Sequence, residues 1–342
     1  MSTPDVKPGQ QLQRFSLRSW SRFSTFGICI APELIGHRHD FEFDDHHVVV
    51  VLPGLDKVDR PSTRHQVASC SHWLKTSEGK VPVEYNIFAV DVNVSIKQEM
   101  DLPPALLELQ CNAFELIPKD QQDRLNELAG THGVIAKRAH AYWLEILRWV
   151  VRDGTLSRPL PRTTDTGWAT CLEEPTSGHQ IWAETQILRV TREPTISVAQ
   201  WEDMQARLNA GARVPTPWEY LLEAEYLLSI DDHRRAALDA AIALEAFVRS
   251  RLESALPGEL HARFRTVIRR SRISDLIVRE TLEAILGDPL AAKFTNEDLL
   301  DLRRLMDRRN RIMHHGQDAE GDLRAEIAAL KYFIEVCEQG ER

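Results

Sequence analysis

The hydrophobic pattern changes its period along the chain, and this change constrains the fold more than any other feature of the sequence. In residues 90–96, Val and Ile alternate with Asp, Asn and Ser, which is the period of two expected for a half-buried strand. From Pro215 to the end, apolar residues recur at the spacing of an α-helix. We therefore expect an α+β fold class, with a β-rich region followed by an all-helical region.

The length of 342 residues leaves room for two domains, each with its own apolar core. We place the boundary near residue 212. Residues 1–212 are expected to form a β-rich α+β region, in which residues 119–152 make one long amphipathic helix. Residues 213–342 are expected to form an antiparallel bundle of four main helices.

Several residues mark the ends of the expected helices. Residues typical of helix starts occur at Ser197 and at Thr295 with Asp298. At a third start, Thr216 is expected to cap the helix, with Pro217 at its first position and Glu219 completing a capping box. Gly316 follows the helix that begins after Thr295 and is well placed as its C-terminal cap. Thr295 and Gly316 therefore mark the start and the end of the helix that contains residues 308–315.

Composition excludes several classes of protein. The formal net charge of -9 argues against a general nucleic-acid coat, although it allows an enzyme that touches RNA at one basic site. The five cysteines lie far apart without a CxxC pair, which indicates reduced thiols and no structural zinc. The polar N-terminus has no apolar segment of a secretory signal, and the apolar runs are too short to span a membrane. We expect a cytoplasmic protein with no membrane partner.

The segment 308–316, Arg-Arg-Asn-Arg-Ile-Met-His-His-Gly, has the residue types that chemistry on a phosphodiester requires. Asn310 and His314 are four residues apart and share one helical face, and the long side chain of Arg309 can reach the same place. His can move a proton, Asn can orient its neighbours and Arg can hold a phosphate. No carboxylate cluster accompanies them, so we expect a metal-independent reaction without a cofactor.

The pattern Arg309-Asn310-x-x-x-His314 resembles the RNxxxH signature of the HEPN superfamily. An Ala-rich segment before it, residues 236–247 with Glu245 in an Ala-Leu-Glu centre, also resembles this family. The resemblance covers about residues 215–338. It implies an RNA endonuclease in which the motif helices of two subunits form one composite site within a homodimer. By this resemblance Arg309 and His314 are catalytic, Asn310 positions them, and Glu245 tethers the site.

Two other groups of polar residues have alternative interpretations. Arg265, Arg269 and Arg270 lie in an arginine-rich stretch and, with Arg311, are candidates for contacting the RNA backbone. The alternative is a solvated helix face balanced by nearby acidic residues. The cluster of His and Asp in residues 37–47 contains zinc-type ligands, but nothing fixes their geometry, and a polar turn is the expectation.

The expected function is an RNA endonuclease of bacterial phage defence or stress response, similar to abortive-infection HEPN proteins. A ligand or phage component acting on residues 1–212 would be its trigger. Two alternatives remain at this point. The bundle could be a non-catalytic dimerisation or nucleotide-binding scaffold, or the chain could be the toxin of a toxin–antitoxin pair.

Overall fold

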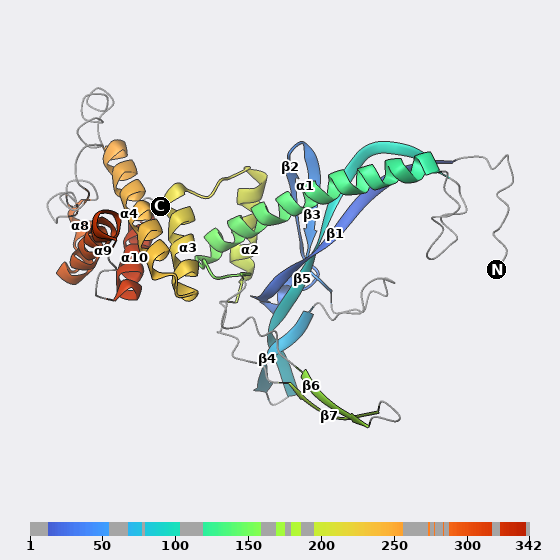
Figure 1. Ribbon diagram of the computed structural model, residues 1–342, viewed down its shortest axis with the longest axis horizontal. Coiled ribbons are helices and arrows are strands. Elements are labelled where there is room, and N and C mark those ends of the chain that lie inside the picture. Colours follow the sequence, from blue (N-terminus) through green and yellow to red (C-terminus); the bar gives the residue numbers. More distant parts are fainter. Residues whose placement is uncertain are drawn as a thin grey trace. The chain divides into compact units, whose positions relative to one another are not determined.

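The computed structural model describes residues 13–54, 68–76, 79–102, 119–158, 169–174, 179–185, 195–255, 273, 277, 283, 287–316 and 322–339. The fold is mixed α+β, with an antiparallel sheet in the N-terminal part and helices after it (Figure 1), as expected. The chain divides into two compact units. The first takes in residues 1–150 and 193–212, and the second takes in residues 151–192 and 213–342.

The first unit is built on a five-stranded antiparallel sheet in the order β1-β5-β3-β2, with β4 also paired to β5. Its strands are β1 (Gln13–Ile30), β2 (Arg38–Phe43), β3 (His46–Val51), β4 (Ala68–Thr76) and β5 (Gly79–Leu102). The short helix η1 (Pro32–Leu34) links β1 to β2. Because β5 pairs with three other strands, it is the strand that organises the sheet.

The alternation predicted for residues 90–96 is confirmed where burial is described. Val90, Val92 and Val94 are buried, whereas Asp91 and Asn93 on the other face are half-buried. The long helix is also confirmed as α1 (Lys119–Val151), and α2 (Val198–Asn209) belongs to the same unit. Side chains of α1 and α2 contact aromatic and histidine side chains of β1, β2 and β3, so these helices complete the core of the unit.

In its described residues, the second unit contains four long helices that pack on one another. They are α3 (Thr216–Ser229), α4 (His233–Ala255), α9 (Asn296–His315) and α10 (Leu323–Gln339), with the short α8 (Asp288–Ala291) before α9. The hairpin β6 (Ala169–Glu174) and β7 (His179–Thr185) falls in the same unit. The core is apolar and aromatic, and includes Trp218, Leu227, Leu244, Leu302 and Phe333.

Most of the helix ends predicted from the sequence are confirmed. Ser197 and Thr295 each form a capping box, and Gly316 ends α9 in the left-handed conformation at φ 65°. The capping box predicted at Thr216 is wrong, because α3 begins at Thr216 itself and Pro215 occupies the cap position. Proline has no side-chain oxygen, so the cap residue Pro215 makes no capping hydrogen bond. Within the described residues, no helix has both the length and the apolar character that crossing a membrane requires.

Candidate functional site at the end of helix α9

The sequence from 308 to 316 forms the last two turns of α9. Leu302 and Met306 are buried on one stripe of this helix, and the same stripe continues through Arg309 and Met313 at spacings of three and four residues. Arg309 is half-buried and Met313 is 59% exposed. The inward stripe therefore leaves the core at the end of the helix, and the motif lies where α9 emerges from the bundle.

The three arginines of the motif have different environments. Arg308 is buried and donates two hydrogen bonds to the carboxylate of Glu326 on α10, at 2.9 and 2.7 Å. Arg309 is half-buried at the rim of the bundle, and Arg311 is exposed. Arg308 is therefore committed to the interior, whereas Arg309 and Arg311 can reach a molecule outside.

Arg309 and Asn310 are brought together. Nη1 of Arg309 donates a hydrogen bond to Oδ1 of Asn310 at 3.0 Å, so the amide holds the guanidinium beside the helix. His314 lies one turn further on, on the face of Asn310, and its side chain is exposed. No hydrogen bond within the described part of the chain joins His314 to either residue. The arrangement offers a guanidinium for an anion and an imidazole for proton transfer, both open to a ligand.

Glu245 is hydrogen-bonded within its own helix. Its Oε1 accepts hydrogen bonds from Nε and Nη2 of Arg249, one turn further along α4. That Glu245 tethers the motif stays a prediction, since its hydrogen bonds in the structure lie within α4. Arg265, Arg269 and Arg270 fall outside the described residues. Arg311 is exposed, as contact with RNA requires.

Sequence reasoning missed the residue that the motif helix is attached to. Glu326 lies on the apolar stripe of α10, between Leu323 and Leu330, and its side chain is 3% exposed. A carboxylate on such a stripe is rarely buried without a partner. That rule, applied to Glu326, would have predicted a buried cation facing it.

A second group of charged residues holds the segment after α1 within the same unit. Glu225 on α3 accepts hydrogen bonds from the backbone N–H of Gly154 and from Nζ of Lys331 on α10. Lys331 also donates to the carbonyl of Arg152. Burial raises the pKa of Glu225, and the Lys331 ammonium opposes this shift. Residues 152–158, which we call the connector, are thus bound to both α3 and α10.

Arg152 strengthens the attachment of the connector. Its guanidinium stacks over the Trp218 ring, 3.7 Å from the centroid, and donates a hydrogen bond of 2.6 Å to Glu338. The indole N–H of Trp218 donates to the same carboxylate. Further along the connector, Arg158 donates to Glu223 of α3 at 2.6 Å. These contacts place one helix, α10, between the connector and the helix that bears the motif.

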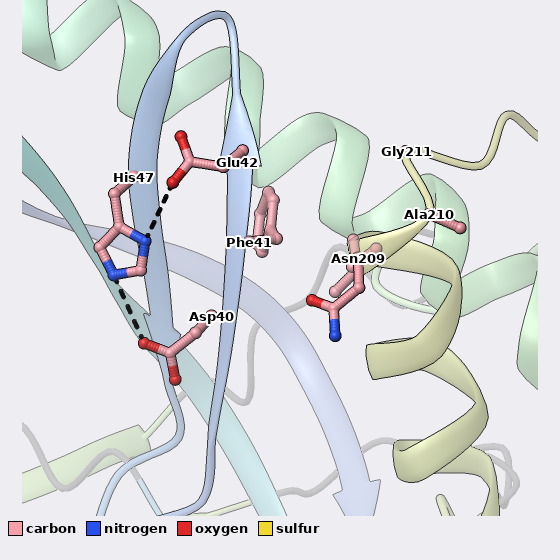
Figure 2. A pocket seen from close by; sticks show the side chains of 8 residues that line it. Asp40, Phe41, Glu42, His47, Asn209, Ala210 and Gly211 are labelled. Atoms are coloured by element: carbon pink, nitrogen blue, oxygen red, sulfur yellow. Dashed lines mark ion pairs between the residues drawn. The ribbon is translucent and has the colours of Figure 1, made fainter.

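The histidine-rich segment of the first unit does not assemble as a set of metal ligands. His39 is buried and hydrogen-bonded to Trp143 and to the carbonyl of Trp201. His47 lies beside an open hollow of about 550 Å³, between the carboxylates of Asp40 and Glu42 at 3.6 and 3.5 Å (Figure 2). In the part of the chain that is described, no three His, Cys, Asp or Glu side chains gather as a metal site would require.

The end of α2 forms the other wall of this hollow, through Asn209, Ala210 and Gly211 (Figure 2). The carboxylates on one side and the C-terminal end of a helix on the other make the hollow electronegative. The hollow suits a cationic group, but His47 already lies beside both carboxylates. The motif of α9 is the stronger candidate, because the half-buried guanidinium of Arg309 and the exposed imidazole of His314 lie about one turn apart at the rim of the bundle.

Comparisons with protein-family models, with curated proteins and with solved structures find no match to this chain. The function is therefore argued from the residues of α9 and their surroundings.

Proposed function

We propose that this chain is a metal-independent endoribonuclease of the HEPN type, with its catalytic groups at the end of α9. The observation that supports the proposal most is the pairing of Arg309 with Asn310, one turn before the exposed His314. A preorganised guanidinium beside an accessible imidazole suits a reaction in which a phosphate gains negative charge while protons move.

In the proposed reaction, the 2′-hydroxyl oxygen of a ribose attacks the adjacent phosphorus as the bond from phosphorus to the 5′ oxygen breaks. One imidazole accepts the proton of the 2′-hydroxyl, and a second imidazole donates a proton to the leaving 5′ oxygen. Arg309 holds the non-bridging phosphate oxygens and Asn310 keeps Arg309 in place. The products are a 2′,3′-cyclic phosphate and a 5′-hydroxyl. DNA lacks the attacking hydroxyl and should resist.

The proposal includes a homodimer. The motif of one copy provides one catalytic imidazole, His314, whereas the reaction uses an acid and a base. Met313, on the stripe that leaves the core, is exposed beside it, and an exposed apolar side chain at this place suits burial against a second copy. A two-fold axis near the end of α9 would bring two His314 side chains to one phosphate.

We further propose that residues 1–212 control the nuclease, with a ligand or phage component favouring one of two populations. The contacts of the connector support this proposal. The chain runs from the end of α1 directly into residues 152–158, which are bound to α10 through Lys331 and Glu338. Because α10 also holds α9 through Glu326, a shift of the connector acts on the helix that bears the motif.

Expression in bacteria tests the proposal. The wild-type chain is expected to slow growth and to fragment cellular RNA when its trigger is present or its expression is high, and His314→Ala is expected to do neither. A chain that is toxic only without a neighbouring gene product would point to the toxin of a pair. An unchanged phenotype of His314→Ala would favour a non-catalytic scaffold.

A further inference from the structure

We infer that Arg308 and Glu326 are positioning residues, which fix the rotation and height of the last two turns of α9. This inference rests on the function proposed above, and it identifies the ion pair that holds the proposed site in position. The pair joins α9 to α10 through two hydrogen bonds of 2.9 and 2.7 Å, with side chains 7% and 3% exposed.

The apolar support of α9 weakens where the motif begins. Leu299, Leu302, Leu305 and Met306 are buried along the first half of the helix. Beyond Met306, Ile312 is the buried apolar side chain, and residues 313–316 are exposed. Packing alone therefore holds the end of α9 loosely. Arg308 is the other buried side chain in this part of the helix. The ion pair therefore lies where the position of α9 against α10 is least determined by apolar packing.

A buried ion pair fixes the position of one helix against another more effectively than it raises the free energy of unfolding. Removing both charges from water costs about as much as their attraction returns, so an apolar pair of similar volume is often equally stable or more so. A guanidinium and a carboxylate that meet through two hydrogen bonds are also restricted in angle, which apolar side chains are not. The pair therefore contributes geometry that Leu or Met at the same places would lack.

The geometry matters because neighbouring positions of a helix differ by about 100° in direction. Arg309 follows Arg308 directly and lies at the rim of the bundle, half-buried. Because Arg309 and Asn310 lie on the same helix, a small rotation of the end of α9 would turn both together, toward the core or away from the proposed position of the phosphate. Misplacement of a catalytic group by about 1 Å can cost about a hundredfold in rate.

The test replaces the pair in the full-length chain by Arg308→Met together with Glu326→Leu. The matched control is Arg22→Met together with Asp91→Leu, which removes a pair of the same kind, with hydrogen bonds of 2.7 and 2.9 Å, between β1 and β5. Arg308→Lys is the second variant, since it keeps the charge but not the two-pronged contact. The measurements are thermal stability, kcat and KM for RNA cleavage, and hydrogen exchange of the amides of residues 309–315.

We expect the apolar pair to fold with an unchanged or raised thermal midpoint. Its kcat should fall at least about tenfold with little change in KM, and exchange of residues 309–315 should speed up about tenfold. Arg308→Lys should show the same changes to a smaller degree. If the apolar pair does not fold, kcat and amide exchange of Arg308→Lys test the inference instead. The control should keep the wild-type values.

Wild-type kcat and exchange in the variants would overturn the inference. If the wild type itself cleaves no RNA, the proposed function fails, and the exchange rates alone decide whether the pair positions α9.

Discussion

The indole N–H of Trp143 donates a hydrogen bond of 3.0 Å to Nδ1 of His39 in the interior of the N-terminal unit. An indole nitrogen can only donate, so Nδ1 must be the unprotonated nitrogen of the imidazole. The proton therefore lies on Nε2, which donates to the carbonyl of Trp201 at 3.0 Å. Burial lowers the pKa of His39 to about 4, helped by nearby His37, so the ring is neutral at pH 7.

Acid is predicted to destabilise the N-terminal unit. Burial also lowers the pKa of His140 to about 4, with a further contribution from Arg148. Above about pH 6.5 both histidines are neutral in the folded and unfolded chains, and stability is unaffected. Between about pH 6.5 and 4 only the unfolded chain binds protons, so the free energy of unfolding should fall by about 3 kcal/mol for each histidine.

Urea unfolding between about pH 7.5 and about 4.5, roughly the window in which a histidine titrates, measures this dependence. His140→Phe should remove about half of it, since Nε2 of His140 has no hydrogen-bond partner in the described structure and phenylalanine fits the stack with Phe23. His315→Gln, at an exposed position in the other unit, is the control and should leave the dependence unchanged. Equal slopes for the wild type and His140→Phe would contradict this assignment.

The sequence predicted the parts of the fold that depend on local pattern. Alternation in residues 90–96 and the signals at Ser197, Thr295 and Gly316 correspond to β5, α2 and α9. The pairing of β5 with three different strands could not be predicted, because pairing depends on residues far apart in the chain. The same holds for the connector, whose partners on α10 lie more than a hundred residues away.

For the site, the sequence predicted the motif but not the separate environments of its arginines. Arg308 and Arg309 are adjacent, and spacing alone does not say which of them points into the bundle. The answer depends on Glu326, which belongs to the next helix. Likewise, the resemblance assigned Glu245 to the site, whereas its hydrogen-bond partner in the structure is Arg249.

Gly154, the glycine of the connector, is predicted not to tolerate a larger residue. A Cβ at this position would lie 1.9 Å from the carbonyl oxygen of Leu222, which is backbone and cannot turn aside. Gly154→Ala should therefore lower the free energy of unfolding by about 2 kcal/mol or more. Gly133→Ala in α1 is the matched control, with nothing within 4 Å, and should raise it by about 0.5–1 kcal/mol. Chemical denaturation of both variants checks the difference, and equal effects would contradict the close packing of the connector.

Release of the connector is predicted to weaken control of the nuclease. In Glu225→Gln with Lys331→Met, the amide oxygen can still accept from Gly154, but the ammonium that joins Arg152 to Glu225 is gone. We expect this chain to be more toxic than the wild type in bacteria, and the addition of His314→Ala to abolish the difference. A folded variant with wild-type toxicity would show that the connector does not restrain α9.

The exposed Met313 is predicted to lie in the dimer interface. Met313→Lys should convert a dimer into a monomer without unfolding, because the side chain is 59% exposed in the single chain. RNA cleavage should fall with dimer content. Val134→Lys, at a 60% exposed position on α1, is the matched control and should remain dimeric. Light scattering checks both variants, and a fully active monomer would contradict the composite site.

We propose that His314 moves a proton in metal-independent cleavage of RNA. Its neighbour His315 is also exposed but lies about 100° further round the helix, away from Asn310, and so provides a matched control. Loss of general acid–base catalysis typically costs about 100-fold to 10,000-fold in rate. His314→Ala should therefore lose at least about a hundredfold, and His315→Ala should stay within about threefold of the wild type.

The most direct measurement is the end group left when the purified full-length chain, with its motif intact, cuts single-stranded RNA in EDTA. We expect a 2′,3′-cyclic phosphate or its hydrolysis product, no cutting of DNA of the same sequence, and loss of the product with His314→Ala but not with His315→Ala. Strict dependence on added magnesium, equal cutting of DNA, or an undiminished rate with His314→Ala would contradict it.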